Sequence, residues 1–449
     1  MTTPDRTPVK VGLVTAASLV VANMIGTGIF TSVGFQVQYL NSPFALLVLW
    51  VVGGGMALCG ALVYGELGAA LPRSGGEYHL ISEIYHPSLG FIVGWITVTL
   101  GFAGPIALAA IAFGDYTTAV FSELSSTHLA ASIVVLCSAI HGMSITWGSW
   151  FQNLFTGLKV LLILVFVAMA VRADPSHTVS VLPDATGLTE LVSPGFAVSL
   201  VFVTYAYAGW NGAVYIVGEI RDPQRNMPRA LVLGTALVTV LYVMLTFVFL
   251  YTVPASEMAG EVEVGYLSGR VIFGDIGGQV MSIFIALLLV STVSAMVYLG
   301  PRVTQAMGED SRALRWLATT NDRGIPANSI LFQAALALAF IYTSTFEQVL
   351  IYAGFTLTLS MMLTVAGVFV LRWRMPEVSR PYTTWGYPVT PLVFLALNAW
   401  ILVYVFIDKP AESLVGLGIV GAGALLYVIS RWFIFEEAVS DEAPVEPSS

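Results

Sequence analysis

Residues 24–30 read MIGTGIF and interrupt the first long apolar run of the 449-residue chain with two glycines around a hydroxyl residue. Glycine disfavours helix by about 1 kcal/mol relative to alanine, and unwound backbone in lipid persists only where it is buried in protein or lines a cavity. A second stretch of this kind, YAYAGWNG at residues 205–212, lies in the sixth apolar run. We predict that both runs are helices that unwind in mid-membrane. For either run taken alone, close helix packing through small residues is an equal alternative.

The composition around these stretches is that of a membrane protein. Apolar residues make up 57% of the chain and charged residues 10%, against roughly 25% charged residues in a soluble domain, and the mean hydropathy is +0.84. Because a span needs about 20 mostly apolar residues, we predict an all-α membrane protein of about twelve transmembrane helices. The predicted spans are 10–39, 43–71, 88–121, 129–146, 150–173, 193–220, 228–254, 274–306, 328–345, 346–373, 387–408 and 411–435.

Lysine and arginine residues indicate the orientation. With the N-terminus in the cytoplasm, 14 of the 18 basic residues fall in cytoplasmic segments, three fall outside, and Lys159 alone lies deep in an apolar run. Because basic residues mark cytoplasmic loops, we expect both termini in the cytoplasm. Residues 1–9 form the N-terminus and lack a cleavable signal pattern. Residues 436–449 form an acidic, disordered tail, and no basic stripe indicates nucleic-acid binding.

The two predicted breaks point to a transporter. They lie five spans apart, in the first span of each half of the chain, and such interruptions at corresponding positions are the best sequence indication of a transporter's binding site. After a break, a half-helix begins with free N–H groups that suit a carboxylate. Before a break, a half-helix ends with free carbonyl groups that suit an ammonium group. A break that offers both ends favours a zwitterion, which is an α-amino acid.

Other functional classes find little support. The chain contains no nucleophile elbow, no His-Glu-x-x-His motif and no P-loop, so we predict neither an enzyme nor an ATP-driven pump. Cys59 and Cys137 both lie in apolar runs, and the five histidines show no ligand spacing. We therefore expect no metal, no cofactor and no disulfide framework. A membrane sensor or channel is the second class, but a receptor of this kind would usually carry an added soluble domain.

Several motifs support a family resemblance. The stretch IGTGIF at 25–30 is followed by YGELG at 64–68, PRSGGEY at 72–78 and YAGWN at 207–211, which continues into GEI, DPQRN and PRA. In this order the motifs resemble the amino acid–polyamine–organocation superfamily, and especially its branch of L-amino-acid transporters and their bacterial relatives. The resemblance implies a LeuT-like five-plus-five inverted repeat with spans 1 and 6 unwound. Its parts would be residues 10–173, residues 193–373, and two peripheral helices at 387–435.

The resemblance also implies a substrate site on the two breaks. The substrate carboxylate would meet the backbone N–H groups of Thr27, Gly28 and Ile29. Tyr205 would act as the aromatic gate over the bound substrate, although the family more often has phenylalanine there. For Asn23, a helix–helix hydrogen bond is an equal alternative to ligand contact. The remaining site residues, with the carbonyl groups for the amino group among them, are Asn23, Met24, Ile25, Gly26, Ala206, Ala208 and Gly209.

Lys159 requires an explanation, because a lysine at mid-membrane costs about 2.5–3.5 kcal/mol. One alternative is that its side chain reaches back to the cytoplasmic surface. The resemblance implies another, since in sodium-independent members a lysine of span 5 takes the place of a sodium ion, here beside the Gly26 carbonyl. Burial disfavours the charged amine, so Lys159 is the candidate residue for proton coupling, with a fixed strut as the alternative. Ser291, Thr292 and Ser294 of span 8 are candidates to face it.

We therefore expect a sodium-independent secondary transporter of amino acids that works by alternating access and proton symport. An amino-acid exchanger and a polyamine or organic cation permease are the alternatives. A neutral substrate is expected, because the sequence places no buried acidic residue at the breaks. Eukaryotic exchangers of the resembling branch pair with a glycoprotein through a cysteine in the loop after span 3, and residues 122–128 contain no cysteine. No disulfide-linked heavy subunit is expected, and the location would be the cell (inner) membrane.

Overall fold

The computed structural model describes residues 11–73, 75–143, 148–173, 179–311, 314–322 and 324–441, without the side chains of 148–153, 156 and 431–441. Within these residues all regular structure is helical except one isolated parallel bridge between Val11 and Ile220. The prediction of an all-α protein is therefore confirmed for the described part of the chain. The predicted N-terminal segment, residues 1–9, lies outside it.

Each predicted span corresponds to one helix or to consecutive helices. The first half contains α1 (Leu13–Met24), α2 (Gly28–Gln36), α3 (Pro43–Ala70), α4 (Gly76–Ile84), α5 (Pro87–Ile96), η1 (Thr97–Ala103), α6 (Gly104–Thr118), α7 (Ser126–Met143), α8 (Gly148–Ala170) and α9 (Ala185–Glu190). The second half contains α10 (Pro194–Tyr207), α11 (Gly212–Tyr215), η2 (Val217–Glu219), α12 (Pro223–Thr252), α13 (Ala255–Met258), α14 (Val264–Asp310), α15 (Arg315–Ala318), α16 (Ala327–Thr343) and α17 (Phe346–Arg374). Two further helices follow, α18 (Val389–Asp408) and α19 (Pro410–Asp441).

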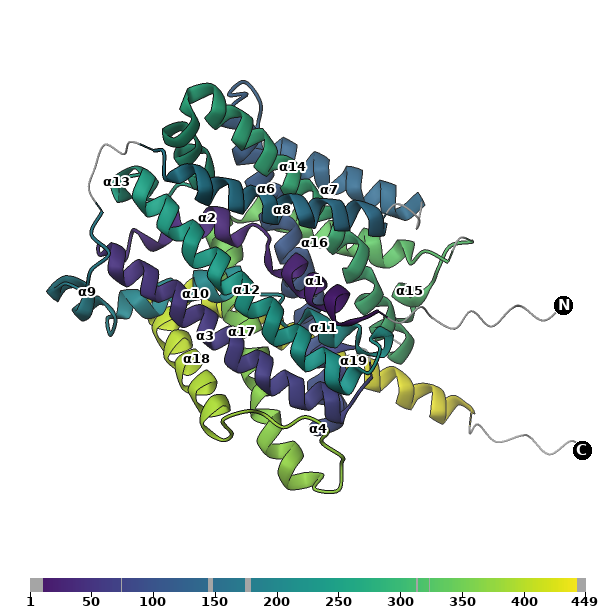
Figure 1. Cartoon of the computed structure of the whole chain (residues 1–449). Coiled ribbons are helices and arrows are strands. Elements are labelled where there is room, and N and C mark those ends of the chain that lie inside the picture. The colour runs from purple at the N-terminus through teal and green to yellow at the C-terminus, as the bar shows by residue number, and fades with distance from the viewer. Residues whose placement is uncertain are drawn as a thin grey trace, which may run out of the picture.

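Eight described helices are long and apolar enough to cross a membrane. If the bent pair α1 and α2 counts as one span, the number of candidate spans is nine. Three shorter apolar helices, residues Gly157–Ala170 of α8, α10 and α16, are the further candidates. The number of twelve spans and the inverted relation of the two halves stay predictions. Figure 1 shows the long helices side by side in one bundle, with α9 and α13 at its left side and α15 at its right side.

Caps and prolines explain where two of these helices begin. The Ser193 hydroxyl accepts a hydrogen bond from the Phe196 amide at 3.1 Å, directly before Pro194 at the first helical position of α10. Thr345 and Gln348 form a capping box at the start of α17, which satisfies two backbone N–H groups that a helix start leaves free. This cap separates α16 from α17 at the predicted tight junction.

Three features differ from simple straight spans. The last helix, α19, ends at Asp441. The disordered tail predicted for residues 436–449 stays a prediction, and residues 442–449 lie outside the described part. The third span contains the π-helical turn η1, a feature that is frequent at functional sites. Within α14, Gly274 has a φ of 76°, and this left-handed backbone separates residues 264–273 from the rest of the helix.

An aromatic cluster fixes the helices that surround the breaks. The ring of Trp50 on α3 lies 5.5 Å from that of Tyr242 on α12 and 5.9 Å from that of Tyr207 at the end of α10. The Trp50 indole also donates a hydrogen bond to Gln36 on α2 at 2.9 Å. Because α12 packs along both α1 and α3, these contacts join both broken spans to two continuous helices.

Candidate functional site

The first broken span turns by 41° between α1 and α2. At the end of α1, Ile25 leaves the helical region with ψ at 85°, and the Gly26 amide donates to the Met24 carbonyl at 2.8 Å. Helix α2 begins at Gly28, and all nine of its residues are buried. The residues between the two helices are therefore 25–27, inside the interruption that the sequence predicted.

The second broken span unwinds between α10 and α11. Ala208 is extended, with ψ at 142°, and Gly209 has a φ of 101°, which favours glycine because a side chain would be strained there. A Cβ atom on Gly209 would also lie 2.7 Å from the backbone oxygen of Asn23. Gly209 thus allows both the left-handed turn and the close approach of the first span.

The two breaks pack directly on each other. A Cβ atom on Gly28 would lie 2.4 Å from the Cα atom of Ala206, and one on Gly212 would lie 2.3 Å from the Asn23 side-chain nitrogen. Unwinding and close packing were alternatives from the sequence, and the structure contains both. Asn23 lies between the two breaks, so it can act as a packing residue as well as a ligand contact.

Tyr242 of α12 joins the two breaks by hydrogen bonds. Its hydroxyl group lies 2.6 Å from the Met24 carbonyl and 3.2 Å from the Ala206 carbonyl. Both carbonyl groups belong to the set predicted for the substrate's amino group. The Met24 carbonyl also accepts from the Gly26 amide, whereas the Ala206 carbonyl keeps a second lone pair for a ligand. The sequence analysis missed Tyr242, and the only available signal was a tyrosine in the middle of an apolar run.

The start of α2 has the features of an anion site. Within the described part of the chain, no acceptor is recorded for the backbone amides of Thr27, Gly28 and Ile29, because the first N–H groups of a helix have no partner inside it. The positive end of the helix dipole lies at the same place. Tyr205, the predicted gate, is 7% exposed, and its hydroxyl group interacts with the Thr27 side chain. The predicted carboxylate site and gate are thus neighbours.

Lys159 is buried on α8, with 3% of its surface exposed. Its ammonium group donates to the Thr292 hydroxyl on α14 at 2.8 Å, so the side chain does not reach the cytoplasmic surface. The Thr292 methyl group lies 3.9 Å from the position of a Cβ atom on Gly26. The recorded connection from Lys159 to the first break therefore passes through Thr292, rather than directly to the Gly26 carbonyl. Ser294, another candidate, instead contacts His141 at 2.8 Å.

A comparison with known families shows to which family the chain belongs. The family profile described as "Amino acid permease" matches residues 11–428. The chain belongs to the amino acid permease family. This confirms the resemblance to the amino acid–polyamine–organocation superfamily, a group of transporters rather than enzymes.

Individual relatives of the permease cover almost its whole length. The large neutral amino acids transporter small subunit 2 of Homo sapiens is 28% identical over 434 residues, which is 94% of this chain and 81% of that protein. The Asc-type amino acid transporter 1 of Mus musculus is 27% identical over 430 residues, again 94% and 81%. The b(0,+)-type amino acid transporter 1 of Homo sapiens is 26% identical over 449 residues, 97% and 91%. These similarities support amino-acid transport by a multi-pass membrane protein.

Two acidic side chains of the permease, on α3 and α4, are buried. Glu66 on α3 is fully buried and pairs with Arg372 on α17 at 2.7 Å, while it also accepts from the Thr384 amide at 2.6 Å. Glu77 on α4 is 4% exposed and accepts a hydrogen bond from Asn211 in the second break. The expectation that no buried acidic residue lies at the breaks is therefore wrong. Glu77 escaped sequence analysis because 134 residues separate it from Asn211.

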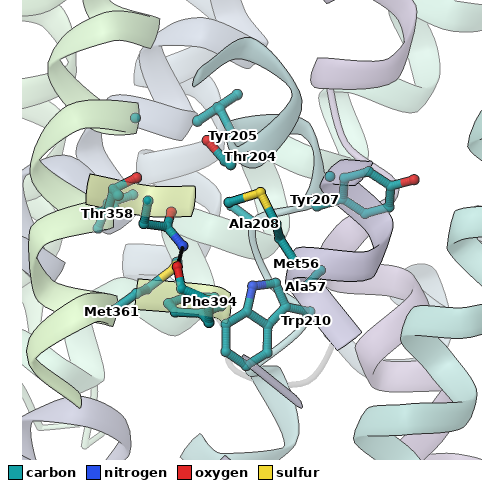
Figure 2. Close-up of a pocket in the computed structure, with 14 residues that line it drawn as sticks. Met56, Ala57, Thr204, Tyr205, Tyr207, Ala208, Trp210, Thr358, Met361 and Phe394 are labelled. Atoms are coloured by element: carbon teal, nitrogen blue, oxygen red, sulfur yellow. Dashed lines mark hydrogen bonds between the residues drawn. The ribbon is translucent and has the colours of Figure 1, made fainter. Parts of the chain in front are cut away.

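A cavity lies behind the second break, between α10, α3, α17 and α18. Ala208, Trp210, Met56, Thr358 and Phe394 line it, as Figure 2 shows, and none of its described lining residues is charged. Its volume is about 20 Å³, which is enough for a water molecule and far too little for an amino acid. No residue of the first break lines this cavity, so it is separate from the contact between the two breaks.

Proposed function

We propose that the permease is a sodium-independent secondary transporter of neutral amino acids, located in the cell (inner) membrane, that works by alternating access with proton symport. The observation that carries this proposal is the direct contact of two broken spans, with Gly28 packed on Ala206. Half-helix ends that meet at one place offer N–H groups and carbonyl groups together. Alternating access requires such a site to face each side of the membrane in turn.

The backbone groups at this contact support an amino-acid substrate. The free amides at the start of α2 would bind the carboxylate, since helix N-termini attract anions. Ala206 would offer the second lone pair of its carbonyl group to the ammonium group. These groups read the part that all amino acids share, so the side chain of the substrate would be selected elsewhere.

The hydrogen bonds of Glu77 favour a neutral substrate. A polyamine or another organic cation would need an acidic partner, and Glu77 is the buried acid that lies at a break. However, its two oxygens already accept hydrogen bonds from Tyr64, Asn211 and Tyr215. The lining of the cavity beside Ala208 adds no charged group. These observations favour the neutral amino acid over the organic cation.

Lys159 supports the proposal of sodium independence. A buried ammonium group beside the first break supplies a positive charge without a bound metal ion. Because burial disfavours the charged form of an amine, Lys159 would release and regain a proton as its surroundings change during transport. Proton symport is therefore preferred to exchange, in which Lys159 would stay charged as a strut.

Uptake into proteoliposomes tests the proposal. Radiolabelled alanine and leucine are offered with external sodium or external choline, and with or without an inward proton gradient. We expect equal uptake in sodium and choline, and faster uptake with the proton gradient. Strong stimulation by sodium would contradict the proposal, and uptake that requires internal amino acid would support the exchanger instead.

A variant pair connects the proton effect to Lys159. Lys159→Gln removes the charge and keeps a group that can hydrogen-bond Thr292, so we expect it to lose most uptake and all response to the proton gradient. Lys409→Gln is the matched control, because Lys409 is partly exposed between α18 and α19, where it pairs with Glu347 at 3.0 Å. An unchanged proton response in Lys159→Gln would assign the coupling to another group.

We further propose that the permease works without a disulfide-linked heavy subunit. The human relative is named a small subunit, but residues 119–125, between α6 and α7, contain no cysteine in this chain. The two cysteines lie on α3 and α7, where Cys59 is partly buried and Cys137 is buried. A non-reducing gel of membranes is expected to show the single chain, and a heavier species that dissociates on reduction would contradict this.

A further inference from the structure

Glu77 is a buried carboxylate without a cationic partner among the described residues. One oxygen accepts hydrogen bonds from Tyr64 on α3, at 3.0 Å, and from Asn211 in the second break, and the other oxygen accepts from Tyr215 on α11. A buried charge is tolerated only when hydrogen bonds replace its hydration, and here three neutral donors do so. One donor comes from the continuous helix α3. The other two come from the two ends of α11 in the second broken span.

The backbone before Glu77 is shaped to bring it to this position. Gly75 and Gly76 have φ values of 137° and 58°, which are strained for other residues. A Cβ atom on Gly76 would lie 2.2 Å from the ring of Tyr215. The two glycines of the motif at residues 72–78 therefore allow α4 to start directly against the ring whose hydroxyl group binds Glu77.

The next residue along α4 contacts a different group of helices. The Tyr78 hydroxyl donates to Asp310 at 2.6 Å, at the end of α14, and burial together with this carboxylate raises the pKa of Tyr78 well above its usual value. Helix α14 also carries Thr292, the partner of Lys159. Two consecutive side chains of α4 thus hold the second broken span on one side and the helix beside Lys159 on the other.

We propose that Glu77 is a positioning residue for transport, which holds the inner half of the second broken span, α11, against α4. This inference rests on the proposed transport function. Through Tyr78, α4 links the motion of α11 to the cytoplasmic end of α14. Glu77 does not contact the substrate; it fixes the place of Asn211, two residues after Gly209 in the predicted binding stretch.

Hydrogen–deuterium exchange on the purified protein without substrate tests the contact itself. Losing a hydrogen bond to a charged group should open α11 more often, so in Glu77→Gln we expect about tenfold faster exchange over residues 212–219. Glu83→Gln is the control, since Glu83 is an exposed glutamate on the same helix. Equal exchange in the two variants would overturn the proposal.

An exchange of the two partners makes the test specific. Asn211→Asp places two carboxylates in contact and should speed exchange beyond Glu77→Gln, whereas Glu77→Gln combined with Asn211→Asp restores an amide–carboxylate pair. The double variant is expected to exchange more slowly than Asn211→Asp alone, and equal or faster exchange would contradict the direct contact. If Glu77→Gln does not fold, Tyr215→Phe removes one donor and is expected to speed exchange of the same residues; no change there would overturn the proposal.

Transport measurements separate positioning from substrate binding. In Glu77→Gln we expect the maximal rate of alanine uptake to fall by far more than the KM changes, because the residue acts on the moving segment and not on the ligand. A large rise in KM at an unchanged maximal rate would instead make Glu77 part of the substrate site. Since the exchange experiment needs no substrate, its result stands even if the proposed transport function fails.

Discussion

Gly26 and Gly28 lie two residues apart in the same break, yet they face different surroundings. A Cβ atom on Gly28 would lie within 2.4 Å of the Ala206 backbone, whereas one on Gly26 would have its nearest neighbours at 3.9 Å. The 2.4 Å distance at Gly28 would require the two broken spans to separate, whereas 3.9 Å at Gly26 is an ordinary contact. The contact between the breaks therefore requires glycine at position 28, whereas neither the space around Gly26 nor its backbone angle requires glycine at position 26.

This difference gives a matched pair of variants. Gly28→Ala is expected to lower the free energy of unfolding by about 1–3 kcal/mol, as overpacking of a tight core does, and to abolish uptake because the spans are forced apart. Gly26→Ala should be stable and retain part of its uptake. Thermal unfolding in detergent and uptake into proteoliposomes measure both effects, and equal loss in the two variants would refute the role given to Gly28.

Residues that conflict with their local surroundings could be predicted from the sequence, and residues that agree with them could not. The paired glycines and Lys159 were visible because lipid disfavours open backbone and charge. Tyr242 was missed because a tyrosine is unremarkable in an apolar helix, and its partner Met24 lies 218 residues away. Glu77 was missed for the same reason of distance, although its motif had drawn attention.

At the scale of helices, α12 is the element that relates one break to the other. It packs along α1, and its Tyr242 hydroxyl group contacts one carbonyl from each break. A rigid helix that holds both breaks would make them move as a unit during transport. The site would then change sides of the membrane without losing the relative placement of its two halves.

The substitution Tyr242→Phe tests this role. It keeps the ring packing against Trp50 and removes only the hydroxyl group, so we expect a loss of about 1–3 kcal/mol in the free energy of unfolding, because the Ala206 carbonyl is left unpaired. Uptake should fall markedly. Tyr251→Phe on the same helix is the control, because the Tyr251 hydroxyl contact with Ala173 is long, at 3.5 Å. Loss of stability in both variants alike would mean that the bridge has no special importance.

Helix positions were predictable because each span must be apolar over its whole length. Prolines such as Pro43 and Pro194 mark where a helix begins. The short helix α4 was not predicted, since nine residues with mixed polarity give no such signal. Its position depends on contacts with α11 and α14 that arise only in the folded chain. The position of α4 could therefore not be predicted from periodicity alone.

At the scale of the whole molecule, the two ends of the bundle differ. In Figure 1, α9 and α13 lie at one side and α15 at the opposite side. Arg315, one of the basic residues of the predicted cytoplasmic segments, is the first residue of α15. The positive-inside bias therefore predicts that α15 faces the cytoplasm and α9 the exterior.

Labelling with a membrane-impermeant maleimide tests this orientation in intact cells. Leu188 on α9 and Thr320 after α15 are both exposed, so Leu188→Cys and Thr320→Cys, each in a Cys59→Ser background, are equally accessible to a reagent that reaches them. We expect label on Leu188→Cys in intact cells, and on Thr320→Cys only after permeabilisation. The reverse pattern would show that the permease has the opposite orientation in the membrane. Label on both in intact cells would place α9 and α15 on one side, which the twelve-span arrangement with both termini in the cytoplasm does not allow.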